Sequence, residues 1–213
     1  MSGQPPVLSY RVELQRKAIH LGALVLPLAI LAVPRPLIGI ALSVLAVLAV
    51  AIDVARQRVA RVRDLIVGVF GWMMRPEELP PLGAPLVFNG AVWMCVSAAI
   101  CAWVFPPDYG AAALAMLMIG DAAAAIVGRK LGRTRWPGSP KSVEGSVAYA
   151  VAAFGTGLVV TAWPGAALTP AVCAVGAVVG AALEAAPIPI DDNMRVPLLS
   201  GLAMLGAAAL GLG

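Results

Sequence analysis

Residues 109–145 read YGAAALAMLMIGDAAAAIVGRKLGRTRWPGSPKSVEG. The stretch opens as a continuous apolar run interrupted only by Asp121, passes through a loop rich in glycine and basic residues, and meets a second apolar run after Glu144. A membrane-spanning helix needs about 20 mostly apolar residues, and a barrel strand would alternate apolar with polar positions. The stretch therefore predicts two membrane helices joined by a cationic loop.

The rest of the chain extends this pattern. It has 213 residues, of which 61% are hydrophobic, and its mean hydropathy is +0.91. Soluble domains contain roughly 45–50% apolar residues, so a water-soluble protein is excluded. We expect an all-α integral membrane protein, one polytopic catalytic domain over residues 1–213, with about seven transmembrane helices. The predicted spans are 18–33, 37–52, 85–105, 109–127, 143–163, 169–186 and 196–212.

The basic residues orient these spans. With the N-terminus in the cytoplasm and the spans alternating, every lysine and arginine except Arg35 falls in a cytoplasmic segment, as the positive-inside rule requires. The C-terminus is then outside. The outer connections are short and poor in reactive groups, so we expect the active site on the cytoplasmic side. The net charge of +4 reflects this orientation and is no argument for nucleic acid.

The segment 53–75 has a different pattern. Apolar residues recur at spacings of four and three, with arginines between them, which is typical of an amphipathic helix lying on the cytoplasmic leaflet. Such a helix could anchor the protein to anionic lipid head groups or act as a gate for a lipid substrate.

The loop between residues 128 and 145 has the groups that an anionic ligand would need. Gly128 and Gly138 permit backbone conformations that expose N–H groups, while Arg129, Arg135 and Lys141 could balance the charge of a nucleotide triphosphate. The sequence from Gly138 to Ser142 does not match a P-loop. The positive-inside rule alone would also account for these cations.

Four carboxylates lie in or next to the cytoplasmic parts of predicted spans. They offer the hard oxygen ligands that Mg2+ prefers, and they are Asp121, Glu144, Asp191 and Asp192. His20 lies near the cytoplasmic start of the first span, one helical turn after Arg16. Asn89 and Glu184 are also polar residues within spans, where interhelical hydrogen bonding is the ordinary role.

Four segments together resemble a known family. They are RKAIH at 16–20, GDAAAAIVGRKLG at 120–132, RWPGSPKSVEGS at 135–146 and IDDNMRVPL at 190–198. They are similar to motifs of the polyprenol kinase family, which includes dolichol kinase, phytol kinase and CTP-dependent diacylglycerol kinase. Phosphatidate cytidylyltransferases are more distantly similar through the SPK…EG element, but often have Ser-Asp-Thr where this chain has Gly120–Asp121–Ala122.

The resemblance implies phosphorylation of a lipid alcohol, with CTP rather than ATP as the donor and with Mg2+. By motif match, the residues that bind nucleotide and metal would be Asp121, Lys141, Ser142, Glu144 and Gly145. Asp191, Asp192 and Asn193 would complete the site, and His20 could orient the lipid hydroxyl or the donor.

Three hypotheses follow for the function. The first is an integral-membrane lipid-alcohol kinase, in which the hydroxyl attacks the γ-phosphate of CTP in line. The second is a cytidylyltransferase, in which phosphatidate attacks the α-phosphate. The third is a non-enzymatic transporter or scaffold. Two observations argue against it: the outer face has no polar path, and the sequence shows no inverted repeat. The partners of the first would be the lipid alcohol, the nucleotide and membrane lipids, and its oligomeric state is open.

Overall fold

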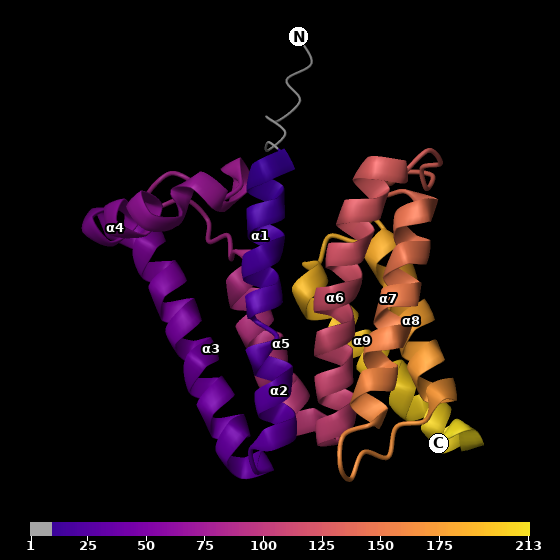
Figure 1. Ribbon diagram of the computed structural model, residues 1–213. Helices are drawn as coiled ribbons and strands as arrows, with labels where there is room; N and C mark the ends of the chain where they lie inside the picture. Colours follow the sequence, from indigo (N-terminus) through magenta and orange to yellow (C-terminus); the bar gives the residue numbers. More distant parts are fainter. Residues whose placement is uncertain (1–9) are drawn as a thin grey trace.

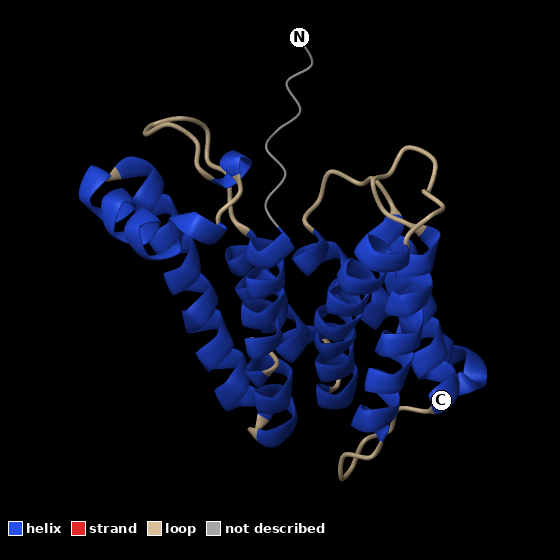
Figure 2. Ribbon diagram, turned by 45° about the horizontal axis from the view of Figure 1, so that its top comes forward, coloured by secondary structure: helices blue, strands red, loops and turns tan. Residues whose placement is uncertain are grey.

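The computed structural model describes residues 10–213, without the side chains of Tyr10, Arg11, Glu13 and Leu14. All regular elements of this part are helical, which confirms the predicted all-α class (Figure 2). The long apolar helices form a bundle, and the polar connections gather at one end, the top of Figure 1. We call this the loop end.

The first half of the chain contains five α-helices and two short 3-10 turns (Figure 1). The helices are α1 (Tyr10–Gly22), α2 (Val25–Ala32), α3 (Arg35–Arg58), α4 (Ala60–Phe70) and α5 (Gly90–Val104), and the turns are η1 (Gly71–Met73) and η2 (Pro76–Glu78).

The second half contains α6 (Pro107–Leu131), α7 (Val143–Thr161), α8 (Pro170–Ala185) and α9 (Asp192–Ala207), followed by a π-helical turn, η3 (Ala208–Leu212). Helix α6 is central, because it packs against α7 most extensively and also contacts α1, α2, α5, α8 and α9.

Five helical segments are long and apolar enough to cross a membrane. They are Gln15–Ala32, which combines α1 and α2, then Arg35–Arg58, Pro107–Leu131, Val143–Thr161 and Asp192–Leu212. The other two predicted spans correspond to the shorter apolar helices α5 and α8. The 15 residues of α5 extend for about 22 Å, less than the roughly 30 Å of a bilayer core.

Large apolar side chains cover outward faces of the bundle. Five of these side chains are more than 50% exposed, on surfaces that no other part of the described chain covers. They are Val44, Val47 and Leu48 on α3 and Val151 and Val159 on α7. A soluble monomer rarely exposes so continuous an apolar surface. These faces fit contact with lipid, and with the five long apolar helices they support a multi-pass membrane protein.

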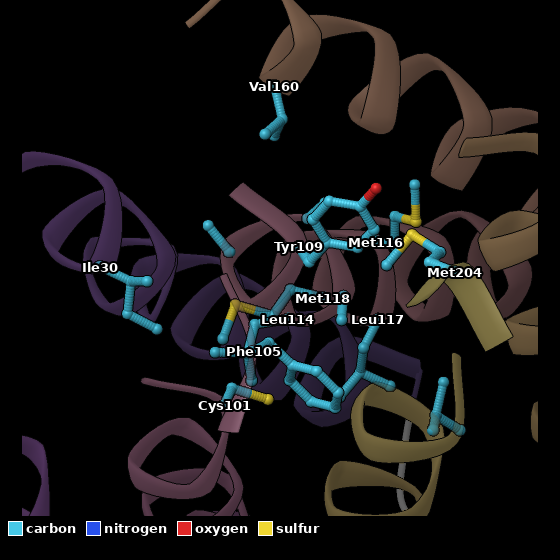
Figure 3. Close-up of a cluster of buried hydrophobic side chains, with 14 of the residues drawn as sticks. Ile30, Cys101, Phe105, Tyr109, Leu114, Met116, Leu117, Met118, Val160 and Met204 are labelled. Carbon is cyan, nitrogen blue, oxygen red and sulfur yellow. The ribbon is translucent and has the colours of Figure 1, made fainter. Parts of the chain in front are cut away.

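The interior is packed around α6. Its side chains Leu114, Met116, Leu117 and Met118 are almost fully buried, and Phe105 lies beside them (Figure 3). Small residues on α6 allow neighbouring helices to approach closely, since a Cβ on Gly110 would lie 2.8 Å from the backbone oxygen of Cys101. The core thus fixes α6 relative to the helices that meet at its loop end.

The prediction of one amphipathic helix over residues 53–75 is wrong at both ends, because α4 covers only Ala60–Phe70. Helix α3 continues to Arg58, Val59 is extended, and only α4 lies across the loop end with no buried residue (Figure 1). Arg56, one of the arginines that the pattern placed between apolar positions, is 1% exposed, and Asp53 at the start of the segment is 2% exposed. They are buried because they pair with each other and with distant segments, which helical periodicity does not report.

Candidate functional site

Six charged or polar side chains converge near the loop end, and we call them the polar centre. They come from α1, α6, α8, α9 and the loop before α7, and they are Lys17, His20, Asp121, Lys141, Glu184 and Asp192. Ionisable side chains between apolar helices are costly and commonly mark functional sites in membrane proteins.

Asp121 joins α6 to α1. Its carboxylate accepts a hydrogen bond from the Lys17 ammonium, and the His20 Nε2 atom lies 4.0 Å from the same carboxylate oxygen, Oδ2. Lys17 and His20 are three residues apart, so one face of α1 presents both to Asp121. Arg16 points elsewhere, donating to the carbonyl of Met73 at 2.7 Å. The Nε2 atom of His20 is buried without a hydrogen-bond partner.

Lys141 joins the loop to α8 and α9. Its ammonium donates to Glu184, which is 3% exposed, and lies 3.8 Å from the Asp192 carboxylate. It also interacts electrostatically with Asp121, which connects the two halves of the polar centre. Burial, the largest single effect, opposes the charged form, but the carboxylates of Glu184, Asp121 and Asp192 together outweigh it and raise the pKa of Lys141 above its ordinary value. Lys141 is therefore a cation at neutral pH.

Asp192 is held in place by Arg195. Two nitrogens of the guanidinium donate to the Asp192 carboxylate, at 2.9 and 2.5 Å. The remaining donors of Arg195 satisfy the carbonyls of Ala186 and Ile188, at 2.9 and 3.1 Å. Arg195 thus ties the end of α8 to the start of α9.

The other residues of the 190–198 motif shape the start of α9. Asp191 caps the helix by accepting from the backbone N–H of Asn193 at 2.9 Å, and Asn193 donates to the carbonyl of Gly90 at 3.3 Å. Burial raises the pKa of Asp191, partly offset by the hydrogen bond from Asn193. Of the two adjacent aspartates, the structure brings Asp192 to the polar centre.

The loop before α7 is folded back on itself. Trp136, Pro137, Gly138 and Ser139 form a turn, in which the Ser139 N–H donates to the Trp136 carbonyl and Gly138 has φ +72°. Proline followed by glycine is typical of a type II turn. Arg135 pairs with Ser142 in an isolated β-bridge, and its guanidinium donates to the Pro140 carbonyl at 2.5 Å.

Ser142, Gly128 and Gly145 form the junction of α6 and α7. The Ser142 hydroxyl caps α7 by accepting from the Gly145 N–H at 3.1 Å. A Cβ on Gly128 or on Gly145 would lie 3.0 Å from that hydroxyl. Close helix packing thus accounts for Gly128, which we expected to expose an N–H group to an anion, and for Gly145, which the resemblance assigns to nucleotide or metal binding.

Glu144 is not brought to Asp121. Its carboxylate accepts from the backbone N–H of Thr134 at 3.1 and 3.3 Å, which stabilises the folded loop. Across residues 10–213, no three histidine, cysteine, aspartate or glutamate side chains are grouped as a metal site. The four predicted metal ligands therefore do not form one cluster. Arg129 lies at the loop end of α6.

A second buried polar cluster was not predicted. Asp53 accepts from Arg56 at 2.6 Å and from Asn89 at 2.7 Å, while Gln57 hydrogen-bonds both backbone groups of Val87. Arg56 also donates to the carbonyl of Glu78 at 2.8 Å. We call Asp53, Arg56, Gln57 and Asn89 the Asp53 cluster. It fastens α3 to the segment before α5, and Asn89 also caps that helix.

Sequence reasoning missed three residues near the polar centre. Lys17 lay inside the RKAIH motif without an assigned role, and Glu184 was interpreted only as an interhelical hydrogen-bonding group. Tyr149 gave no signal, because a tyrosine within an apolar run is an ordinary core residue. A carboxylate within a span needs a partner, so Glu184 could have been paired with a lysine from the sequence.

Comparisons with known proteins found one informative relative. An uncharacterized protein of Rickettsia prowazekii (strain Madrid E) is 26% identical over 188 residues, which cover 87% of this chain and 90% of that protein. No family model matches the chain. No solved structure matches it. The similarity thus extends over most of both chains.

Proposed function

We propose that the protein is a CTP-dependent kinase that phosphorylates a membrane lipid alcohol at the polar centre. The observation that carries the proposal is the convergence of Lys17, Lys141, Asp121 and Glu184 between apolar helices. Cations for phosphates and carboxylates for a metal ion are the parts that phosphoryl transfer uses. The similarity of the motifs at 16–20, 120–146 and 190–198 to the polyprenol kinase family supports the same reaction.

The proposal includes an orientation. The seven apolar segments cross the membrane with the N-terminus inside and the C-terminus outside, so that the loop end faces the cytoplasm. The distribution of basic residues supports this topology. The nucleotide then reaches the polar centre from the cytoplasm, and the lipid alcohol reaches it from the inner leaflet between helices.

The carboxylates fit Mg2+ bound together with a nucleotide. Mg2+ is usually held by one or two carboxylates plus substrate phosphates, so Asp121 and Glu184 would suffice without the three-residue cluster that the described part of the chain lacks. When bound, the ion supplies charge neutralisation on the phosphates. Both carboxylates are paired with lysines, and those lysines would turn to the phosphates as the nucleotide enters.

In the proposed reaction, the lipid hydroxyl oxygen forms a bond to the γ-phosphorus of CTP. The bond from that phosphorus to the bridging oxygen breaks, and CDP leaves with the electron pair. The hydroxyl proton passes to the His20 imidazole, whose Nε2 atom is buried near Asp121 without another partner. Lys17 and Lys141 stabilise the negative charge on the phosphates.

The position of the transferred label tests the proposal. Purified protein is incubated with a polyprenol, phytol, diacylglycerol or phosphatidate and with CTP labelled at either the α- or the γ-phosphate. We expect label from the γ-position in the lipid and none from the α-position. Transfer of the α-label to phosphatidate would instead identify a cytidylyltransferase, and no consumption of CTP with any of these lipids would favour a transporter or scaffold.

Replacing Lys141 with alanine should weaken CTP binding. A hydrogen bond to a charged group contributes about 1.5–3 kcal/mol, so the dissociation constant should rise about ten- to a hundredfold. Equilibrium binding of CTP to purified protein measures it. Lys130→Ala is the matched control, because Lys130 is exposed at the end of α6. Equal effects of the two substitutions would mean that the loop acts only through its general positive charge.

A further inference from the structure

Tyr149 lies in a space that two glycines create. Its ring packs between Gly120 of α6 and Gly180 of α8, where an added Cβ would lie 2.8 Å and 3.0 Å from the tyrosine side chain. The side chain is fully buried. Three helices are thus fitted around this one aromatic ring.

The hydroxyl of Tyr149 is buried and has no hydrogen-bond partner. A buried tyrosine hydroxyl usually finds one, and leaving it unsatisfied costs free energy that phenylalanine would not cost in the same space. The hydroxyl interacts electrostatically with the carboxylates of Asp121, Glu184 and Asp192. It therefore lies beside the polar centre without a hydrogen-bond partner of its own.

The position of Tyr149 favours a neutral hydroxyl as its hydrogen-bond partner. Tyr149 comes seven residues after Ser142, so it lies about 10 Å down α7 from the cationic loop. The lysines are the groups suited to anionic phosphates. A phosphate oxygen beside Tyr149 would be repelled by the surrounding carboxylates, whereas an alcohol oxygen can accept from the phenol while its own proton passes to His20.

We propose that the Tyr149 hydroxyl hydrogen-bonds the hydroxyl oxygen of the lipid alcohol and positions it beneath the nucleotide phosphates. This inference rests on the proposed kinase function and names the residue that recognises the acceptor. The alcohol reaches Tyr149 when Lys141, whose side chain is 36% exposed, turns from Glu184 to the phosphates.

Binding of geranylgeraniol tests the inference. The purified protein is saturated with the β,γ-methylene analogue of CTP, and its thermal unfolding is followed as geranylgeraniol or the hydrocarbon of the same chain is added. A ligand that binds the folded state raises the unfolding temperature. We expect the alcohol to raise it for the wild type and the hydrocarbon to have little effect.

The Tyr149→Phe variant removes only the oxygen. Its unfolding temperature without ligand should equal or exceed that of the wild type, while its affinity for the alcohol should fall about two- to tenfold, as expected for one lost neutral hydrogen bond. Tyr109→Phe is the matched control, because Tyr109 is also buried but lies near the opposite end of α6. That variant should bind the alcohol as the wild type does.

Two results would overturn the inference. Unchanged alcohol affinity in Tyr149→Phe would show that the hydroxyl does not contact the acceptor, and so would a wild type that fails to distinguish the alcohol from the hydrocarbon. Transfer of the γ-label separates this failure from failure of the kinase proposal. Label transfer with an unchanged KM for the alcohol in Tyr149→Phe rejects the inference alone, whereas Tyr149-dependent binding without label transfer rejects the kinase alone.

Discussion

Replacing Asp121 with asparagine should lower lipid phosphorylation by about a thousandfold or more, the scale of charge stabilisation in phosphoryl transfer. Asparagine keeps the size of the side chain and removes the negative charge that faces Lys17 and His20. Transfer of γ-phosphate from CTP to a lipid alcohol measures the effect. The unfolding temperature in detergent should change little, because the Lys17 side chain is partly exposed and can reach water.

Two further variants make this result interpretable. Asp64→Asn is the matched control on α4, where the carboxylate is exposed, and it should leave turnover unchanged. Glu144→Gln should have a smaller effect than Asp121→Asn, because the Glu144 carboxylate binds the Thr134 N–H. Full turnover in Asp121→Asn would reject the polar centre as the active site. A loss of turnover in Glu144→Gln as large as in Asp121→Asn would instead assign the reaction to the loop before α7.

Replacing Asp53 with alanine should destabilise the fold by about 3–5 kcal/mol, as expected when one partner of a buried ion pair is removed. The substitution leaves the buried Arg56 guanidinium without its carboxylate and takes an acceptor from Asn89. The free energy of unfolding in detergent and the yield of folded protein measure it. Asp64→Ala should change neither.

A double substitution distinguishes the stability that comes from the ion pair from the stability that comes from filling the same space. Asp53→Leu combined with Arg56→Met replaces both charges by apolar side chains, and it should recover part of the stability lost in Asp53→Leu alone. Recovery would be partial, since Asn89 still loses a partner. If Asp53→Ala were as stable as the wild type, the Asp53 cluster would not fasten α3 to α5 as described.

The apolar segments could be predicted because the length and composition of each one favour a helix independently of its neighbours. The run at 109–127 became α6, and the others correspond to helices whose starts follow local signals such as the capping hydroxyls of Ser142 and Thr169. The start of α4 could not be predicted, because Asp53 and Arg56 are buried through contacts with Glu78 and Asn89. Helical periodicity does not distinguish an exposed charge from a buried pair.

The candidate site could also be predicted only in part from the sequence. His20 and Asp121 were singled out, and the structure places them together. Glu144, which was grouped with Asp121 as a candidate metal ligand, is held at Thr134 because the loop folds back through its Trp136–Ser139 turn. The partners Lys17 and Glu184 depend on how α1, α6 and α8 pack, which the sequence of each helix alone does not determine.

The mass of the lipid product tests the central claim most directly. The purified protein is incubated with CTP and Mg2+ and, in separate reactions, with a polyprenol, phytol, diacylglycerol or phosphatidate, and the extracted lipid is analysed by mass spectrometry. The proposed kinase predicts that at least one alcohol gains the mass of a single phosphoryl group while an equal amount of CDP is released. Unchanged alcohols, or a cytidylyl adduct formed only with phosphatidate, would contradict it.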